Sequence, residues 1–323
     1  MTLRRWHKKM TQLLELQEKL RDTGAAIAQH ERAMANSKSP SLASALRSLQ
    51  KRLDRLESEY TELTRQFGID VCSYRLFGDR ESAVPAVAIF AALEAFQMAF
   101  SVAYDAVKRG PRAKASLTAD VRHESEFQFG YAFSGSVGIV MTFKNEQLML
   151  ETALDQSMDA LFDLARSKTA DEVLAKSKTL GASVVKAAHK WASNHVNAGL
   201  GVDVKWIRGA TEKSRLLLQI PELKTLVATL ANATEDIEDT VTLAGVLVGV
   251  ETESSRRFHF KSDDGEDIKG YHSHNVISIE NPASSPARYE ATFERKMKKI
   301  MATDEEVSAT YFLVKLNPLS TPA

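Results

Sequence analysis

The chain has 323 residues, of which 44% are hydrophobic and 26% are charged. This length predicts two or three folded units, and this composition excludes a globally disordered, collagen-like or mucin-like chain. The 42 basic and 42 acidic residues balance, so the overall charge attracts the protein neither to nucleic acid nor to an anionic membrane.

The charges are distributed unevenly along the sequence. Residues 1–67 carry 13 basic and 8 acidic side chains, whereas residues 238–323 carry 10 basic and 14 acidic ones. Cys72 is the only cysteine, which excludes an intrachain disulfide framework and favours a reducing compartment. The basic residues near the N-terminus have no apolar run behind them, so we expect a cytoplasmic protein.

Residues 42–67 carry a heptad pattern that predicts a coiled-coil seam. Its apolar residues alternate at steps of four and three, and they are Leu42, Leu46, Leu49, Leu53, Leu56, Tyr60, Leu63 and Phe67. Residues 3–34 follow the same rhythm less cleanly. The segment between the two runs contains Pro40 and favours a helix break, with Ser41 as the next N-cap. We therefore expect a helical coiled-coil hairpin arm over residues 1–67, whose seam packs on a second copy, another protein or its own domain.

Residues 68–237 predict a central α+β domain that begins with a strand at 71–77 and continues with a very apolar helix at 86–107. The polar residues of this helix lie on one narrow stripe, at Glu94, Gln97, Ser101 and Asp105. Such a helix is typical of a core element packed on a sheet. Its 22 residues are also long enough to cross a membrane, but the carboxylates make a span costly.

Period-two runs at 117–121, 127–133 and 137–143 predict three antiparallel strands. The second run carries aromatic residues at 127, 129, 131 and 133, which we expect to cover the apolar helix, with a base-stacking platform as the alternative. Two helices follow at 146–166 and 170–195, the second with His189 on the surface and His195 at its C-terminal end. Strands at 202–206 and 216–220 and a helix that begins at Pro221 complete the domain.

Residues 238–323 predict a small β-barrel-like module. Strand patterns lie at 241–250, 257–261, 268–271, 289–296 and 307–316. Residues 263–265 form a tight turn, while Gly245 and Gly249 allow the first strand to bend as a small closed barrel requires. In organisation the module resembles an OB-like or SH3-like barrel. Its acidic excess favours a protein partner over nucleic acid.

His259, His272 and His274 are the candidate metal ligands of this module. Histidines two residues apart on a strand share a face, so His272 and His274 have the spacing to chelate one ion. Glu222-Leu-Lys224 with Asp203 has the residue types of a Mg²⁺-dependent nuclease site, but Pro221 places it at a helix start. Both patterns are also typical of solvated surface residues. The sequence contains no phosphate-binding loop, dinucleotide-binding fingerprint or nucleophile elbow.

The sequence indicates no catalytic residue and no cofactor. We therefore expect a non-catalytic assembly, adaptor or sensor protein that oligomerises or docks through its arm and binds a partner through the C-terminal module. The alternatives are a metal-dependent hydrolase or nuclease centred on the second half, and an oligomer that associates with a membrane through residues 86–107. Nucleic acid is the less favoured partner, and a membrane is not expected.

Overall fold

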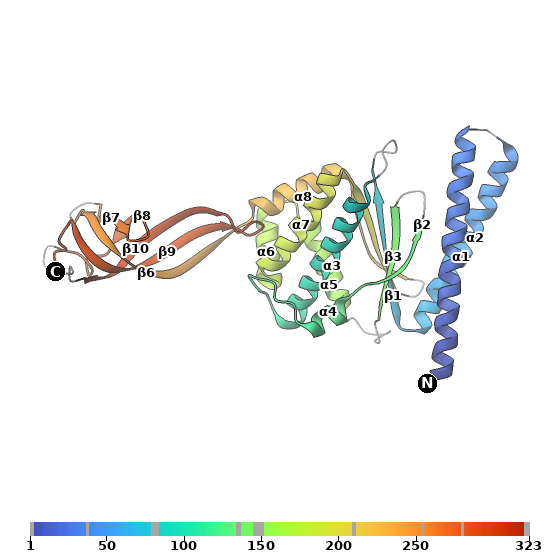
Figure 1. Cartoon of the computed structure of the whole chain (residues 1–323), viewed down its shortest axis with the longest axis horizontal. Coiled ribbons are helices and arrows are strands. Elements are labelled where there is room, and N and C mark those ends of the chain that lie inside the picture. The colour runs from blue at the N-terminus through green and yellow to red at the C-terminus, as the bar shows by residue number, and fades with distance from the viewer. Residues whose placement is uncertain are drawn as a thin grey trace. The chain divides into compact units, whose positions relative to one another are not determined.

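The computed structural model of this chain describes residues 3–36, 39–78, 84–133, 137–144, 152–208, 211–252, 255–278 and 281–319. Internal contacts divide the chain into two units, Met1–Ala231 and Asn232–Ala323. The first combines helices with a five-stranded sheet, and the second is a closed five-stranded barrel (Figure 1). The predicted α+β class and the C-terminal barrel are confirmed, whereas the domain boundaries predicted after residues 67 and 237 stay predictions.

The first unit is built around a sheet with the strand order β2-β3-β1-β4-β5. Its strands are β1 Ile69–Phe77, β2 Gln128–Phe133, β3 Val137–Lys144, β4 Gly201–Arg208 and β5 Thr211–Leu218. Its helices are α1 Leu3–Asn36, α2 Pro40–Gln66, α3 Ala86–Arg109, α4 Ala119–Ser125, α5 Ala153–Ala165, α6 Ala170–Leu180, α7 Ala182–Ala198 and α8 Ile220–Asn232. Neighbouring strands are antiparallel, as the period-two patterns predicted.

Helices α1 and α2 form a hairpin that packs on one face of this sheet (Figure 1). A buried apolar cluster joins both helices to the strands, and its members are Leu13, Leu16, Leu20, Leu56, Tyr60, Val71, Tyr131 and Val140. The lower part of the seam is therefore filled by the protein's own domain. The coiled-coil geometry itself stays a prediction. The N-cap of α2 is Ser39 instead of Ser41, because Pro40 fits the first helical turn, where no backbone N–H is needed.

Helix α3 packs on the other face of the sheet, as predicted. The ring centroid of Phe96 lies 4.8 Å from that of Tyr74 on β1, and Phe100 lies 6.3 Å from Phe143 on β3. The polar stripe is not a solvent-facing line, because Ser101 and Asp105 are buried. Gln97 donates to the backbone carbonyl of Ser125, so the segment that leads into β2 covers this part of the stripe.

Two further sequence predictions in this unit, of secondary structure, are wrong. Residues 119–125 form the short helix α4, because Thr118 caps it by accepting a hydrogen bond from the backbone N–H of Val121. The predicted helix at 170–195 is two helices, α6 and α7. They are separated by Gly181, whose φ of +81° and close approach to the Arg112 backbone exclude a side chain.

The predicted aromatic face of β2 is also divided. The strand is irregular between Phe129 and Tyr131, so Phe127 packs on α3 while Tyr131 contacts Tyr60 of the hairpin. Phe129 is exposed. The turn predicted at 134–136 lies outside the described residues.

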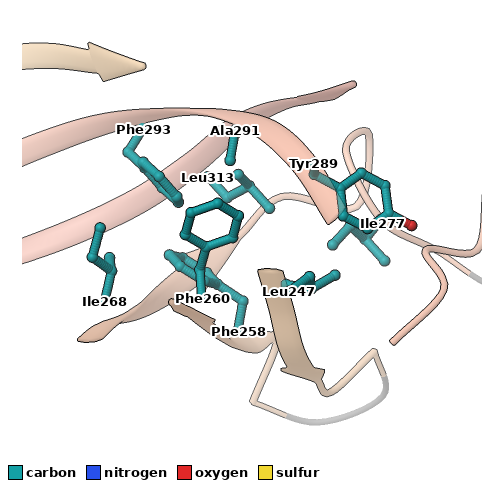
Figure 2. Packing of buried hydrophobic residues seen from close by; sticks show 9 residues of the cluster. All are labelled: Leu247, Phe258, Phe260, Ile268, Ile277, Tyr289, Ala291, Phe293 and Leu313. Atoms are coloured by element: carbon teal, nitrogen blue, oxygen red, sulfur yellow. The ribbon is translucent and has the colours of Figure 1, made fainter. Parts of the chain in front are cut away.

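The second unit contains the strands β6 Thr234–Val250, β7 Arg257–Ser262, β8 Asp267–His272, β9 Ala287–Ile300 and β10 Glu306–Pro318. All five predicted strands are confirmed. Strands β6, β7 and β8 form an antiparallel meander, β9 pairs with β6 and β10, and the parallel pair β8–β10 closes the barrel. Figure 2 shows the apolar core that fills it, with Phe258, Phe260 and Phe293 in ring contact.

Candidate functional site

The outer face of β7, β8 and β10 carries the candidate site. Burial alternates along β7 and β8, so every second side chain points away from the barrel core. The residues that define this outer face are Arg257, His259 and Lys261 on β7, Asp267, Lys269 and Tyr271 on β8, and Thr310 and Phe312 on β10.

Two aromatic rings stack at the centre of this face. Tyr271 and Phe312 are opposite each other in the parallel pair β8–β10, and their ring centroids lie 5.9 Å apart with an interplanar angle of 28°. Tyr271 is 41% exposed. Phe312 is half-buried. A stacked aromatic pair that is partly exposed in this way is typical of a binding surface.

A cation flanks each end of this aromatic pair. The guanidinium of Arg257 lies 5.9 Å from the Tyr271 ring centroid, and the ammonium of Lys296 on β9 lies 5.9 Å from the Phe312 ring centroid. We call Arg257, Tyr271, Phe312 and Lys296 the cation–aromatic row. Because the row crosses four adjacent strands, the closed barrel is what brings these residues together.

A groove of about 600 Å³ lies against the row. It is lined by Gly249, Val250, Glu251, Arg257, Phe258, His259, Lys269, Gly270, Tyr271, Ala309 and Thr310. These residues come from β6, β7, β8 and β10 and from Glu251 directly after β6. A groove of this size, with aromatic and cationic side chains, accommodates a flat ring system and an anionic group together.

The charged side chains around the groove interact with one another. His259 Nε2 contacts Asp267 Oδ1, and the Lys269 ammonium lies 3.5 Å from the other oxygen of that carboxylate. The hydrogen bond from His259 is the main cause that lowers the pKa of Asp267. Asp267 is therefore an anion held between the His259 ring and the Lys269 ammonium, while Arg257 and Lys261 give the face a positive balance.

Four acidic residues of β6 lie opposite basic residues of β9, and one of these basic residues is Lys296 of the row. The antiparallel register of β6 and β9 places Glu235 opposite Lys299, Asp236 opposite Lys298, Glu238 opposite Lys296 and Asp239 opposite Arg295. Arg295 binds both oxygens of Asp239 at 2.9 and 2.6 Å, which lowers the pKa of that carboxyl. We call these four pairs the charge ladder. Opposed charges directly across a strand pair stabilise it.

The predicted metal ligands are not gathered into one site. His259 points outward beside Asp267, whereas His272 is buried and its ring nitrogens lie 2.8 and 3.2 Å from the carbonyls of Glu251 and Ser273. Among the described residues, no group of three or more His, Cys, Asp or Glu side chains is placed to hold a metal ion. His274 therefore gains no ligand partners from the fold.

The residues of the nuclease-like pattern have structural contacts. Asp203 binds Arg215 through two hydrogen bonds of 2.8 and 2.9 Å. Glu222 accepts a hydrogen bond from the backbone N–H of Gln219 at the start of α8. These contacts hold a strand pair and a helix end, and they do not place the two carboxylates on one ligand.

The seam residues of the arm differ in their surroundings. Leu56 and Tyr60 are buried on the sheet, and the Tyr60 hydroxyl accepts a hydrogen bond from Gln17 at 3.1 Å. Leu42, Leu46, Leu49, Leu53, Leu63 and Phe67 are half-buried. The seam therefore retains accessible apolar area, mainly toward the tip of the hairpin.

A buried ionic cluster in the first unit is structural. Arg208 donates three hydrogen bonds of 2.7–3.2 Å to Asp70 and one of 2.6 Å to Asp155. Burial alone raises the pKa of Asp155, but hydrogen bonds from Thr152 and Arg208 outweigh it and the net pKa is lowered. The cluster ties β1, β4 and α5 together, and it lies in the protein interior.

A second buried network joins α7 to β1. Because the Leu200 carbonyl can only accept, His195 Nδ1 donates to it at 3.1 Å, and Nε2 accepts from the Tyr74 hydroxyl at 2.6 Å. Trp191 Nε1 donates to Tyr74 at 2.8 Å. Burial lowers the pKa of His195 to about 4. His195 is thus a neutral core residue, which corrects the prediction of a residue that benefits from the helix dipole.

The cation–aromatic row was missed by the sequence analysis. The available signal was an aromatic residue at a solvent-facing position of a short strand, as Tyr271 is between Lys269 and the end of β8. Nothing in the sequence pairs it with Phe312, because the two residues are 41 positions apart and meet through a parallel strand pair.

The described helices include one, α3, that is long and apolar enough to span a membrane by length and composition. Its Phe96 and Phe100 are buried in the core of the first unit. Comparisons of the chain with protein-family models, with curated proteins and with solved structures gave no match.

Proposed function

We propose that this chain is a non-catalytic binding protein whose C-terminal barrel binds single-stranded nucleic acid across its outer face. The observation that carries the proposal is the cation–aromatic row, in which a partly exposed stacked pair lies between two cations. Successive unpaired bases stack on aromatic side chains, and neighbouring Arg and Lys residues bind the phosphates. Tyr271 and Phe312 would each receive one base.

The strand order supports the same proposal. The barrel begins with a three-stranded meander, its third and fifth strands are parallel, and its fourth strand lies between the first and the fifth. This order is that of the Greek-key barrel of the OB fold. Such barrels bind oligonucleotides or oligosaccharides on the face of their second and third strands, which here are β7 and β8. The groove and the row lie on that face. Because fold alone does not establish function, the residues of the row carry the argument.

The acidic excess of the whole barrel module favoured a protein partner. A ligand on the outer face, however, responds to the charges of that face more than to the net charge of the module. On β7 and β8 the outer face has Arg257, Lys261 and Lys269 against Asp267, while Lys296 of the row is shared with Glu238 of β6 at 2.8 Å. Phosphates respond to charges within about 10 Å at 0.1 M salt. A strand that crosses the outer face would therefore meet a positive surface.

The proposal is tested by fluorescence anisotropy with the full chain and labelled polymers. We expect binding of a 15-nucleotide oligo-dT, with weaker binding of a duplex of the same length. Three phosphate contacts predict a slope of about −2 for log K against log salt concentration. If neither the oligo-dT nor the duplex binds, the proposal is refuted. If calorimetry instead shows binding of a chitin or cellulose oligosaccharide, the ligand is a carbohydrate.

A protein-adaptor function is the second candidate, and the half-buried seam residues favour it. Leu42, Leu46 and Leu49 lie near the hairpin tip, where a helix of another protein or a second copy can extend the seam. Leu49→Asp should then break a complex or oligomer without changing the barrel. The hydrolase alternative gains no support, since its candidate residues have the hydrogen bonds described above. The membrane alternative requires lipid contact by the exposed Val87 and Phe90 of α3, whereas Phe96 and Phe100 of the same helix are buried in the core.

A further inference from the structure

The groove on the barrel extends past the cation–aromatic row as far as Gly249. The row lies on β7, β8, β10 and β9, whereas the groove is also lined by Gly249 and Val250 of β6. A Cβ atom at Gly249 would meet nothing within 4 Å, and the φ angle of this glycine lies outside the left-handed region. The backbone conformation therefore does not require glycine here, and the missing side chain leaves open space at this end of the groove.

A planar side chain stands beside this space. The register of β6 on β7 shifts between Leu247 and Gly249, and this shift places Gly249 directly opposite His259. On the other side of β7, His259 lies opposite Lys269 of β8. We call the space between Gly249, Val250 and His259 the Gly249 hollow. Unpaired bases stack on histidine as well as on other aromatic rings, so the imidazole provides a wall for a flat ligand.

The polar groups at this end of the groove favour a base over a phosphate. The Asp267 carboxylate contacts His259 Nε2 and can only accept, so Nε2 is the donor. Nδ1 of the neutral ring is then an acceptor, and it has no hydrogen-bond partner among the residues that the structure describes. Every base has an N–H donor on its edge, whereas phosphate oxygens only accept and are repelled by the carboxylate.

We propose that the Gly249 hollow receives a third unpaired base of the strand whose other two bases stack on Phe312 and Tyr271. The inference rests on the proposed function and extends its site by one base. Strand β7 lies between β6 and β8, so the hollow is two strand spacings, about 10 Å, from the Tyr271 strand. Arg257 on β7 lies on this path beside the Tyr271 ring, where its guanidinium binds the connecting phosphate.

Fluorescence anisotropy with the full chain and labelled 15-nucleotide oligo-dT tests the hollow. Gly249→Leu fills it, and we expect binding to weaken at least about fivefold through the loss of one base contact. The slope of log K against log salt concentration should stay unchanged, because no phosphate contact is lost. Ala244→Leu is the matched control, since Ala244 is exposed on the same strand and does not line the groove. It should bind like the wild type, and urea midpoints show whether both variants fold.

His259→Ala tests the same subsite without adding volume to β6. This variant removes the imidazole wall and the Nδ1 acceptor, so it should also weaken oligo-dT binding about fivefold. His274→Ala is its control, because His274 is exposed in the same unit and does not line the groove. The His274 variant should bind like the wild type.

The outcomes separate this inference from the proposed function. If the wild type does not bind oligo-dT, the proposed function fails and the third subsite fails with it. If the wild type binds oligo-dT and the Tyr271→Ala/Phe312→Ala variant binds it more weakly, the row is the nucleic-acid site. In that case, unchanged binding by both Gly249→Leu and His259→Ala would overturn the third subsite alone.

Discussion

Tyr271 and Phe312 face each other across the parallel strand pair that closes the barrel, with their ring centroids 5.9 Å apart. The same strand pairing therefore completes the fold and assembles the proposed base-stacking surface. Any change that opens this pair should affect both stability and binding, whereas truncation of the rings should affect binding selectively.

Gly270 controls that closure. A Cβ atom at this position would lie 2.1 Å from the backbone carbonyl of Tyr311, so Gly270→Ala should force β8 and β10 apart. We expect a loss of about 2 kcal/mol or more in the free energy of unfolding of the barrel, as for other overpacked sites. Gly249→Ala is the control, because nothing lies within 4 Å of its Cβ position. Urea denaturation of both variants measures the difference, and equal midpoints would contradict the close contact.

The charge ladder sets the register of β6 and β9. Asp239→Lys should destabilise the barrel by about 1 kcal/mol, because it opposes two cations where Arg295 now binds a carboxylate. The double exchange Asp239→Arg with Arg295→Asp should recover most of that loss. Thermal denaturation at low and high salt checks the electrostatic origin, since added salt should reduce the penalty of the single variant. A penalty unaffected by both the exchange and salt would argue for a steric cause.

The ionic cluster of Asp70, Arg208 and Asp155 should be a major stability element of the first unit. Arg208→Met leaves two buried carboxylates without their cation, and we expect a loss of about 3–5 kcal/mol in the free energy of unfolding. Arg65→Met removes a cation paired with Glu62 on the exposed surface of α2 and should change the free energy of unfolding far less. Denaturant titration compares the two. If both variants lose equally little free energy of unfolding, apolar packing by Met can replace the ion pairs of Arg208.

His195 should make the first unit sensitive to acid. Its folded pKa of about 4 lies below the ordinary 6.5, so the folded state binds the proton more weakly than the unfolded state does. The contribution of neutral His195 to the free energy of unfolding is therefore fully present above about pH 6.5. It is lost as the pH decreases toward 4, by up to about 3 kcal/mol. His195→Gln should be less stable at pH 7.5 but lose less between pH 6.5 and 4.5. The exposed His123→Gln variant should retain the wild-type dependence, which urea midpoints at several pH values measure.

Local patterns predicted most elements but not the contacts between them. Period-two alternation located all five strands of the barrel, and apolar content identified α3. Period-two alternation did not distinguish the α4 segment from a strand, because the α4 helix depends on the Thr118 cap. The Ala-rich sequence after Gly181 concealed the break between α6 and α7. The buried role of His195 depends on Tyr74, 121 residues away in sequence.

The candidate site was beyond sequence reasoning for the same reason. Arg257, Tyr271 and Lys296 each have ordinary strand surroundings in the sequence. Their alignment in one row with Phe312 depends on the register of three strand pairs, and one of them is parallel and joins distant segments. The net charge of the module does not show how its charges are placed, because the ladder and the outer face are defined only by the strand pairing.

The most direct test of the proposed function is equilibrium binding of labelled 15-nucleotide oligo-dT to the Tyr271→Ala/Phe312→Ala double variant. Loss of two stacked bases at about 1–3 kcal/mol each predicts at least about 30-fold weaker binding, with unchanged thermal stability of the first unit. Val307→Ala, an exposed apolar residue on β10 outside the row, should bind like the wild type. Equal affinity of the wild type and the double variant would contradict the assignment of the row as the nucleic-acid site.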